Sequence, residues 1–488
     1  MNLPRRLRFI PLSVAGALAL FFVLWRMDFP KPANDDLFYC GAAINLAGGG
    51  NLSNPLLVRQ GFSSQLFFVY PPLHSYALAS WLKLFGVSAA SLTGFQAAMY
   101  VITAAATIFI LRRFGGPVWL EWLVPLGVCT AFMPLGFRPE AMAGALIMAG
   151  FAMLVYSRAL IATLFGFLLT FFGASAAPRM APLSVAFTVL AAYRLWKNLE
   201  GDKSKPWKIL APMAAAFGIT TLVFLVQIHF CLGEFWHTFS VHAHERVLGS
   251  RITLAMQFLF AYPDTTQLPL LLLLVEFLFF ACQRPGNEPT HLGFAALGGL
   301  LLAAAFKLLG HGSIWFGVLA VLVLAIPVLN GVPRAHAKLL KFGLAGSILF
   351  ANIASCAQIY GTLRGKIDTD PGRRRDQAFA MRSTPDHSVL VDNQVARYLF
   401  DYRLPAGFID ARFAGLDAED YASQGIREGD VVLCGPETVA AFRVYGYLRK
   451  QTAQWRPLGL PKPAFDTHPR RVYVLTSKDC ELKESDDQ

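Results

Sequence analysis

The chain is organised around the stretch Ala33-Asn34-Asp35-Asp36-Leu37-Phe38-Tyr39, which turns at Gly48-Gly49-Gly50 and ends Tyr70-Pro71-Pro72-Leu73-His74-Ser75-Tyr76. This is the first polar segment after the first hydrophobic run, residues 9–25. Two adjacent carboxylates therefore follow a run of membrane-spanning length, and placing charge beside a bilayer is unfavourable. The pair indicates a polar site early in the chain.

The composition is that of an integral membrane protein. Of the 488 residues, 55% are hydrophobic and only 15% are charged, and the mean hydropathy is +0.47. A soluble protein would carry about a quarter charged residues. Apolar runs of near-bilayer length predict an α-helical polytopic protein with about eleven transmembrane helices. They lie near residues 9–25, 89–111, 118–136, 139–157, 159–177, 181–197, 207–229, 268–282, 291–309, 314–330 and 340–360.

The charge pattern predicts the orientation of these spans. The net charge is +12, but most Lys and Arg residues fall in short loops, which is the positive-inside pattern and requires no nucleic-acid partner. We read residues 9–25 as a retained signal anchor whose N-terminus is cytoplasmic. An odd number of spans then places the C-terminal tail outside. The loops assigned to the cytoplasm contain Arg112, Arg113, Arg158, Arg194, Lys197, Lys203, Lys205, Lys208, Arg284, Arg334, Lys338 and Lys341.

Two domains are expected. Residues 1–360 form the membrane domain, with a first external loop at 28–86 and a second at 230–267, and residues 72–85 form an amphipathic helix in the interface. Residues 361–488 form a small extracytoplasmic α/β domain, because short apolar runs at 388–391, 431–433 and 472–475 alternate with polar, helix-like segments. If this tail is exported, Cys434 and Cys480 become candidates for a disulfide.

Asp35 and Asp36 have two readings. In one, Asn34 or Asp35 caps a helix whose dipole favours acidic residues. In the other, one carboxylate accepts a proton from an acceptor hydroxyl as general base. The second carboxylate would then hold the acceptor or a divalent cation, since paired acids suit a hard ion. A divalent metal ion is the one cofactor that this pattern suggests.

The first-loop motif resembles that of GT-C-type glycosyltransferases, which include the protein O-mannosyltransferase and lipid A aminoarabinose transferase relatives. In that family the loop reads acid-acid-x-x-Tyr, followed by a glycine-containing turn and a Pro-Pro-Leu-Tyr helix that ends in Phe-Gly. The corner Phe137-Arg138-Pro139-Glu140 similarly resembles the family's Arg-Pro-Asp/Glu corner. In the aminoarabinose transferase branch an Arg precedes the Tyr and a Lys precedes Pro-Pro, whereas this chain has Phe38 and Tyr70 there.

The resemblance implies a GT-C-type membrane fold and an enzymatic activity. The activity is the transfer of a sugar, with inversion, from a polyprenyl-phosphate carrier to a lipid, glycan or protein acceptor outside a bacterial inner membrane. By motif, Asp35 is the base, Asp36 binds the acceptor or a metal, and Tyr39 contacts the carrier. Tyr70, His74 and Glu140 belong to the same polar site.

The departing polyprenyl phosphate also needs cations. The candidates on the outer side are Arg59, Arg138, Arg179, Lys307 and His311. Each has an alternative reading as an end-of-span residue that snorkels to the interface. His242 and His244 are candidates for substrate contact, for a structural role or for metal ligation. A flippase of lipid-linked sugars, which would need no catalysis, is the alternative function.

Overall fold

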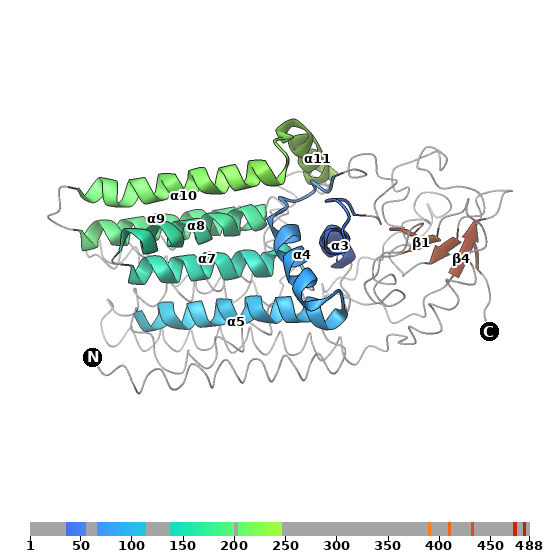
Figure 1. The fold of residues 1–488 in the computed structure, drawn as a ribbon, viewed down its shortest axis with the longest axis horizontal. Coiled ribbons are helices and arrows are strands. Elements are labelled where there is room, and N and C mark those ends of the chain that lie inside the picture. Colours follow the sequence, from blue (N-terminus) through green and yellow to red (C-terminus); the bar gives the residue numbers. More distant parts are fainter. Residues whose placement is uncertain are drawn as a thin grey trace, which may run out of the picture.

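The structure is a computed structural model that describes residues 36–54, 66–113, 137–157, 159–199 and 204–245, together with five short strands near the C-terminus. The described residues from 36 to 245 form a bundle of long helices with shorter helices at one end (Figure 1). Its helices are α3 (Asp36–Ala47), α4 (Leu73–Phe85), α5 (Ala89–Arg113), α7 (Pro139–Tyr156), α8 (Leu160–Ala176), the 3-10 turn η3 (Pro178–Met180), α9 (Ala181–Asn198), α10 (Lys205–Gln227) and α11 (Leu232–Glu245).

Five predicted spans are helices in the structure. The runs at 89–111, 139–157, 159–177, 181–197 and 207–229 correspond to α5, α7, α8, α9 and α10, with ends that agree to within two residues. Three of the described helices are long and apolar enough to cross a membrane, namely Ala90–Arg113, Pro139–Tyr156 and Pro206–Gln227. The other six predicted spans lie outside the described residues, so the total of about eleven stays a prediction. The predicted interfacial helix is α4, which begins directly after Pro72.

Helix α7 is the centre of the described bundle, where it packs against α5, α8 and α9. Its contact with α8 is close because glycines lie on both helices. A Cβ at Gly150 would lie 2.6 Å from the Gly166 carbonyl oxygen, and one at Gly173 would lie 2.8 Å from the Ala143 carbonyl oxygen. Small residues that let helix backbones approach in this way are typical of membrane bundles. α9 joins this pair through Ser184, whose hydroxyl donates to the Thr170 carbonyl at 2.8 Å.

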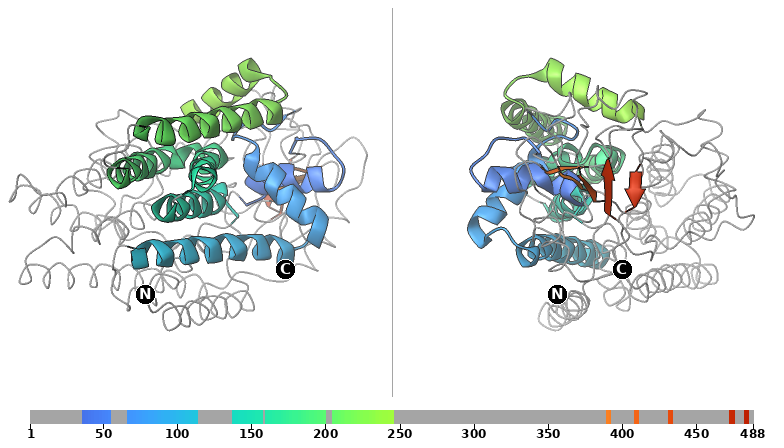
Figure 2. Two further views of the ribbon diagram at one scale, coloured as in Figure 1. Left: turned by 60° about the vertical axis from the view of Figure 1, so that its left-hand side comes forward. Right: turned by 90° about the vertical axis from the view of Figure 1, so that its right-hand side faces the viewer.

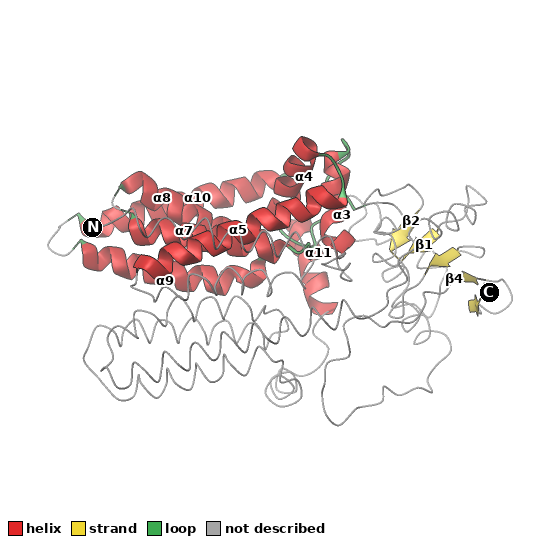
Figure 3. Ribbon diagram, turned by 90° about the horizontal axis from the view of Figure 1, so that it is seen from below, coloured by secondary structure: helices red, strands yellow, loops and turns green. Residues whose placement is uncertain are grey.

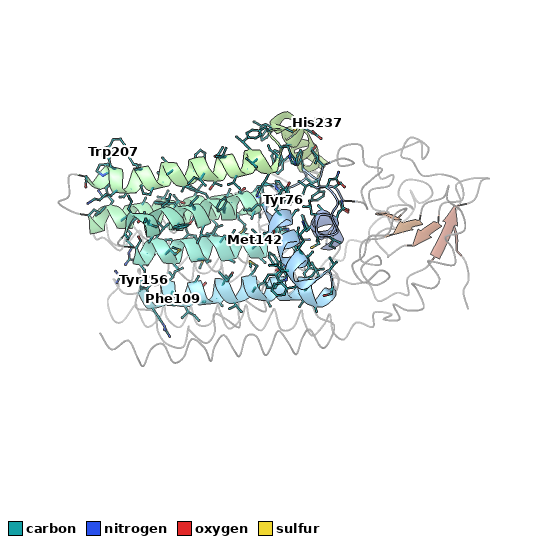
Figure 4. All side chains as sticks on the ribbon, viewed as in Figure 1. Tyr76, Phe109, Met142, Tyr156, Trp207 and His237 are labelled. Atoms are coloured by element: carbon teal, nitrogen blue, oxygen red, sulfur yellow. The ribbon has the colours of Figure 1, made fainter. Side chains whose placement is uncertain are left out.

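The two ends of the bundle differ in what they carry. Tyr156, Phe109 and Trp207 lie at one end, while Tyr76 and His237 lie at the other (Figure 4). The first end also carries the basic residues Arg112 and Arg113. The second end gathers α3, α4 and α11 beside the start of α5 and the end of α10 (Figure 2). We call this second end the loop end.

The C-terminal strands form one sheet in the order β2-β1-β3-β4-β5. β1 (Val389–Val391) is parallel to β2 (Phe408–Asp410) and to β3 (Val431–Leu433), whereas β4 (Val472–Leu475) is antiparallel to β3 and to β5 (Leu482–Glu484). β1, β3 and β4 confirm the three predicted strand positions. The segments that link the strands lie outside the described residues, so the α/β domain stays a prediction. The sheet lies beyond the loop end of the bundle, past α3 (Figure 3).

Candidate functional site

The first loop reverses direction at its glycine run. Gly49 has a φ of +89°, a conformation that glycine adopts without steric cost. The Gly50 N–H donates to the Asn45 carbonyl at 2.9 Å, and the Asn45 amide donates to the carbonyls of Asn51 and Ser53 at 3.0 and 3.2 Å. The chain therefore folds back along α3.

The returning chain packs closely on α3 and on the α10–α11 junction. Asn54 is buried so close to Gly41 that a Cβ at position 41 would overlap its side chain. The Phe67 N–H donates to the Leu52 carbonyl at 2.6 Å, and the Phe68 ring lies 5.9 Å from that of Phe235 on α11. One apolar cluster thus joins the loop to α11; its buried members are Tyr39, Ala42, Leu52, Phe67, Phe68, Val69, Tyr70, Ile228 and Phe235.

Two tyrosines of the first-loop motif meet in this cluster. The Tyr39 hydroxyl donates to the Tyr70 hydroxyl at 3.3 Å, and the two rings are edge to face with centroids 5.1 Å apart. Both side chains are buried, with 2% and 7% of their surface exposed. Tyr39 comes from the first turns of α3, and Tyr70 immediately precedes the Pro-Pro that starts α4.

The Phe137–Glu140 corner brings a cation to this pair. Arg138 is the N-cap residue of α7, with an extended backbone (φ −77°, ψ 151°), and Pro139 takes the first helical position. The Arg138 Cζ lies 5.9 Å from the centroid of the Tyr39 ring, within the range of a cation–π contact. Glu140 follows in the first turn of α7, where the helix dipole favours an acid, and it is 2% exposed. Residues 39, 70 and 138, which are far apart in the sequence, are therefore in one place.

His74 of α4 is buried among other side chains. Its side chain is 3% exposed, and its ring is 6.0 Å from that of Phe95 on α5. Burial lowers the pKa of His74 to about 4, so the imidazole is neutral at pH 7. Within the part of the chain that the structure describes, His74 Nε2 is buried without a hydrogen-bond partner. A neutral imidazole of this kind can donate or accept one hydrogen bond but supplies no charge to a phosphate.

The remaining predicted site residues have no described side chains. Asp36 begins α3, Arg179 lies in η3, and His242 and His244 lie in α11, but only their backbones are described. Arg179 is at the loop end, because η3 follows the end of α8, and α8 begins beside Tyr156 at the opposite end. Asp35, Arg59, Lys307 and His311 lie outside the described residues. Among the side chains that are described, no three His, Cys, Asp or Glu residues gather as metal ligands do.

Two residues of the site were missed by the sequence analysis. The Gln96 amide of α5 donates to the Arg138 carbonyl at 3.5 Å, and the Cys40 thiol of α3 donates to the Phe137 carbonyl at 3.5 Å. Both side chains are buried. In the sequence these residues are only a glutamine within an apolar span and a cysteine directly after Tyr39. Neither pattern predicts a hydrogen-bond partner about 40 or more residues away.

Comparison with known proteins supports the fold. No protein-family model matches the sequence, and no curated protein matches it. Among solved structures, ArnT from Cupriavidus metallidurans bound to undecaprenyl phosphate is similar with a TM-score of 0.53 at 13% identity, over 89% of this chain and 94% of that chain. The apo state of the same protein gives 0.52 at 12% identity, over 91% and 96%. The chain therefore has the fold of a GT-C-type membrane glycosyltransferase, as the first-loop motif predicted.

Proposed function

We propose that this chain is a GT-C-type glycosyltransferase of a bacterial inner membrane. It moves a sugar from a polyprenyl-phosphate carrier to a lipid, glycan or protein acceptor, with inversion at the anomeric carbon. One observation carries the proposal. The Arg138 guanidinium lies over the Tyr39 ring, and the Tyr39 hydroxyl donates to Tyr70, so two separate motifs that the family resemblance singles out converge at one end of the bundle. The bundle has the fold of ArnT, whose crystal structure contains undecaprenyl phosphate.

The charge distribution supports an external site. Arg112 and Arg113 end α5, and the Arg113 Cζ lies 5.7 Å from the Tyr156 ring centroid at the end of α7. Lys208 lies in the first turn of α10, at this same end. Positively charged loops stay in the cytoplasm. The opposite, loop end therefore faces the periplasm, together with the proposed C-terminal domain, residues 361–488, which would cover the site or contact the acceptor.

The reaction needs a base and an anion-binding group. Asp35 takes the proton of the acceptor hydroxyl, the resulting oxygen forms a bond to the anomeric carbon, and the bond from that carbon to the phosphate oxygen breaks. The electron pair leaves with polyprenyl phosphate, whose charge Arg138 stabilises with Arg179, Lys307, Arg59 or His311. Asp36 and Glu140 shape the polar site around the acceptor, and His242 and His244 of α11 are proposed contacts for the substrate.

A divalent metal ion would fit the proposed site in one place. Adjacent carboxylates such as Asp35 and Asp36 are the hard oxygen ligands that Mg²⁺ or Ca²⁺ prefers. A bound ion would add positive charge near the leaving phosphate.

Sugar transfer in reconstituted vesicles tests the proposal. Wild-type protein and Asp35→Asn, both shown to be folded, receive a panel of polyprenyl-phosphate sugars, and the release of polyprenyl phosphate is measured. Loss of a positioned base should lower the release by about 100- to 10,000-fold. Unchanged release in Asp35→Asn would contradict this assignment and move the base to Asp36 or elsewhere. If the lipid-linked sugars cross the bilayer and no polyprenyl phosphate is released from any of them, the result would support the flippase instead.

A further inference from the structure

The corner that carries Arg138 is held by side chains from two other helices. Arg138 is the N-cap of α7, so the Phe137 carbonyl precedes the helix and lies outside its ladder of backbone hydrogen bonds. The Phe137 side chain is 1% exposed, and a buried carbonyl requires a partner. The Cys40 thiol supplies it from α3, and the Gln96 amide donates to the next carbonyl from α5.

We propose that Gln96 and Cys40 are positioning residues that aim the Arg138 guanidinium. This inference rests on the proposed function, because it assigns the purpose of their hydrogen bonds to the binding of the carrier phosphate by Arg138. The two bonds fix consecutive carbonyls, and two fixed points determine the direction in which the peptide between them runs. The Arg138 side chain leaves the backbone from that point and lies over Tyr39, which directly precedes Cys40 in α3.

Burying the Gln96 amide is energetically unfavourable, and packing alone does not explain why an amide is present here. Gln96 is 3% exposed, and among the described residues its Oε1 is buried without a hydrogen-bond partner. An unsatisfied buried oxygen is unfavourable, and a leucine of similar size would avoid it. A residue that serves only to fill space between α5 and α7 would therefore be apolar. The functional part of the amide is its N–H group, which donates to the Arg138 carbonyl.

Gln227 provides a matched control. It is the last residue of α10, and its Oε1 is also buried without a partner in the described part of the chain. Within the described residues its side chain makes no hydrogen bond to the Arg138 corner, and its backbone carbonyl accepts a bond from the Tyr76 hydroxyl at 3.5 Å. Gln227→Leu therefore removes the same chemical group from a helix end without touching the corner.

A double-mutant cycle on the transfer reaction tests the inference. Gln96→Leu should lower kcat by about 10- to 100-fold with little change in the KM for the donor, because Arg138 is then misdirected when charge develops on the leaving phosphate. In an Arg138→Gln background the same substitution should cost less than about 2-fold, since its effect passes through Arg138. Cys40→Ala should behave as Gln96→Leu does, whereas Cys40→Ser keeps a donor and should retain most activity. Additive losses, or an unchanged kcat in Gln96→Leu, would overturn the inference.

A second measurement does not depend on catalysis. Cys40 is 0% exposed, so it should react slowly with maleimide in folded wild-type protein, as followed by mass spectrometry of the peptide that contains it. Releasing the corner in Gln96→Leu should raise this rate several-fold, at a Tm close to that of Gln227→Leu, which should leave the rate unchanged. Equal rates in the two variants would refute the positioning role. If wild-type protein transfers no sugar from any donor, the proposed function fails, and this labelling still decides whether Gln96 holds the corner.

Discussion

Two arginine–tyrosine pairs at opposite ends of the bundle have nearly the same geometry and different surroundings. Arg113 lies 5.7 Å from the Tyr156 ring centroid, and Arg138 lies 5.9 Å from that of Tyr39. Tyr156 is 46% exposed, whereas Tyr39 is 2% exposed. A cation on an exposed ring remains hydrated, but one over a buried ring interacts more strongly with any anion that joins it. The comparison separates an arginine over an exposed ring from one over a buried ring, where the proposed phosphate site lies.

The largest expected effect is on catalysis by the buried pair. Arg138→Gln should lower sugar transfer by about 100- to 1,000-fold, as loss of one charge-stabilising donor does in other enzymes. Arg113→Gln should change it by less than about 2-fold, because a surface cation at the opposite end adds little to stability or chemistry. Vesicle assays of both variants at equal protein content provide the measurement. Equal losses would remove the functional distinction between the two ends.

The next effect concerns α7, which begins directly after Arg138 and ends at Tyr156. Gly150→Leu should lower the free energy of unfolding by about 3 kcal/mol, since its side chain would overlap Thr170 and the Gly166 carbonyl across the α7–α8 contact. Gly218→Leu is the matched control on α10, because nothing lies within 4 Å of a Cβ there. Thermal unfolding in detergent should show a lower Tm for the first variant alone. A shift of the same size in both would place the cost in the helix backbone.

Acid should destabilise the folded protein through His74, which lies at the loop end. The folded-state pKa of His74 is lowered from 6.5 to about 4, so the unfolded chain binds the proton more readily between these values. Stability should therefore be complete near pH 7 and fall as the pH drops through 6.5, by about 2 kcal/mol at pH 5. In His74→Phe this part of the pH dependence should vanish. Tm values at pH 7 and pH 5, with exposed His237→Phe as the control, would reveal it; an unchanged acid response in His74→Phe would contradict the assignment.

The smallest effect is that of single hydroxyl groups. Tyr39→Phe keeps the ring beneath Arg138 but removes the bond to Tyr70, and should cost about 1 kcal/mol of stability because a buried hydroxyl loses its donor. Tyr156→Phe removes a 2.9 Å bond to the Phe109 carbonyl at an exposed position and should cost less than about 0.5 kcal/mol. Chemical denaturation of both variants measures the difference. A larger loss in Tyr156→Phe would reverse the burial argument.

The sequence predicted those features that depend on local composition. Apolar length located α5, α7, α8, α9 and α10, and the glycine run located the reversal after α3. The convergence of Tyr39, Tyr70 and Arg138 was accessible only through the family motif, because no periodicity relates residues so far apart. The roles of Asp35, Asp36 and the other unplaced residues stay predictions.

Other features were hidden for physical reasons. The predicted second external loop, residues 230–267, contains α11, which follows a turn in which His229 and Phe230 have positive φ values of 52° and 59°. Left-handed backbone at two consecutive residues without glycine has no sequence signature. β2 (Phe-Ile-Asp) and β5 (Leu-Lys-Glu) contain charged residues, so neither is the purely apolar run that located the equally short β1 and β3.

The loop cluster has a consequence for the order in which the protein is made. Synthesis runs from the N-terminus, and the partners of the first loop are separated from it by increasing lengths of chain. Tyr39 and Tyr70 are 31 residues apart, and Cys40 and Phe137 are 97 apart. Ile228 and Phe235, which complete the cluster, come last. A nascent chain that stops before α11 therefore exposes the apolar side of its first loop, and the ribosome must finish roughly half of the protein before that surface is covered.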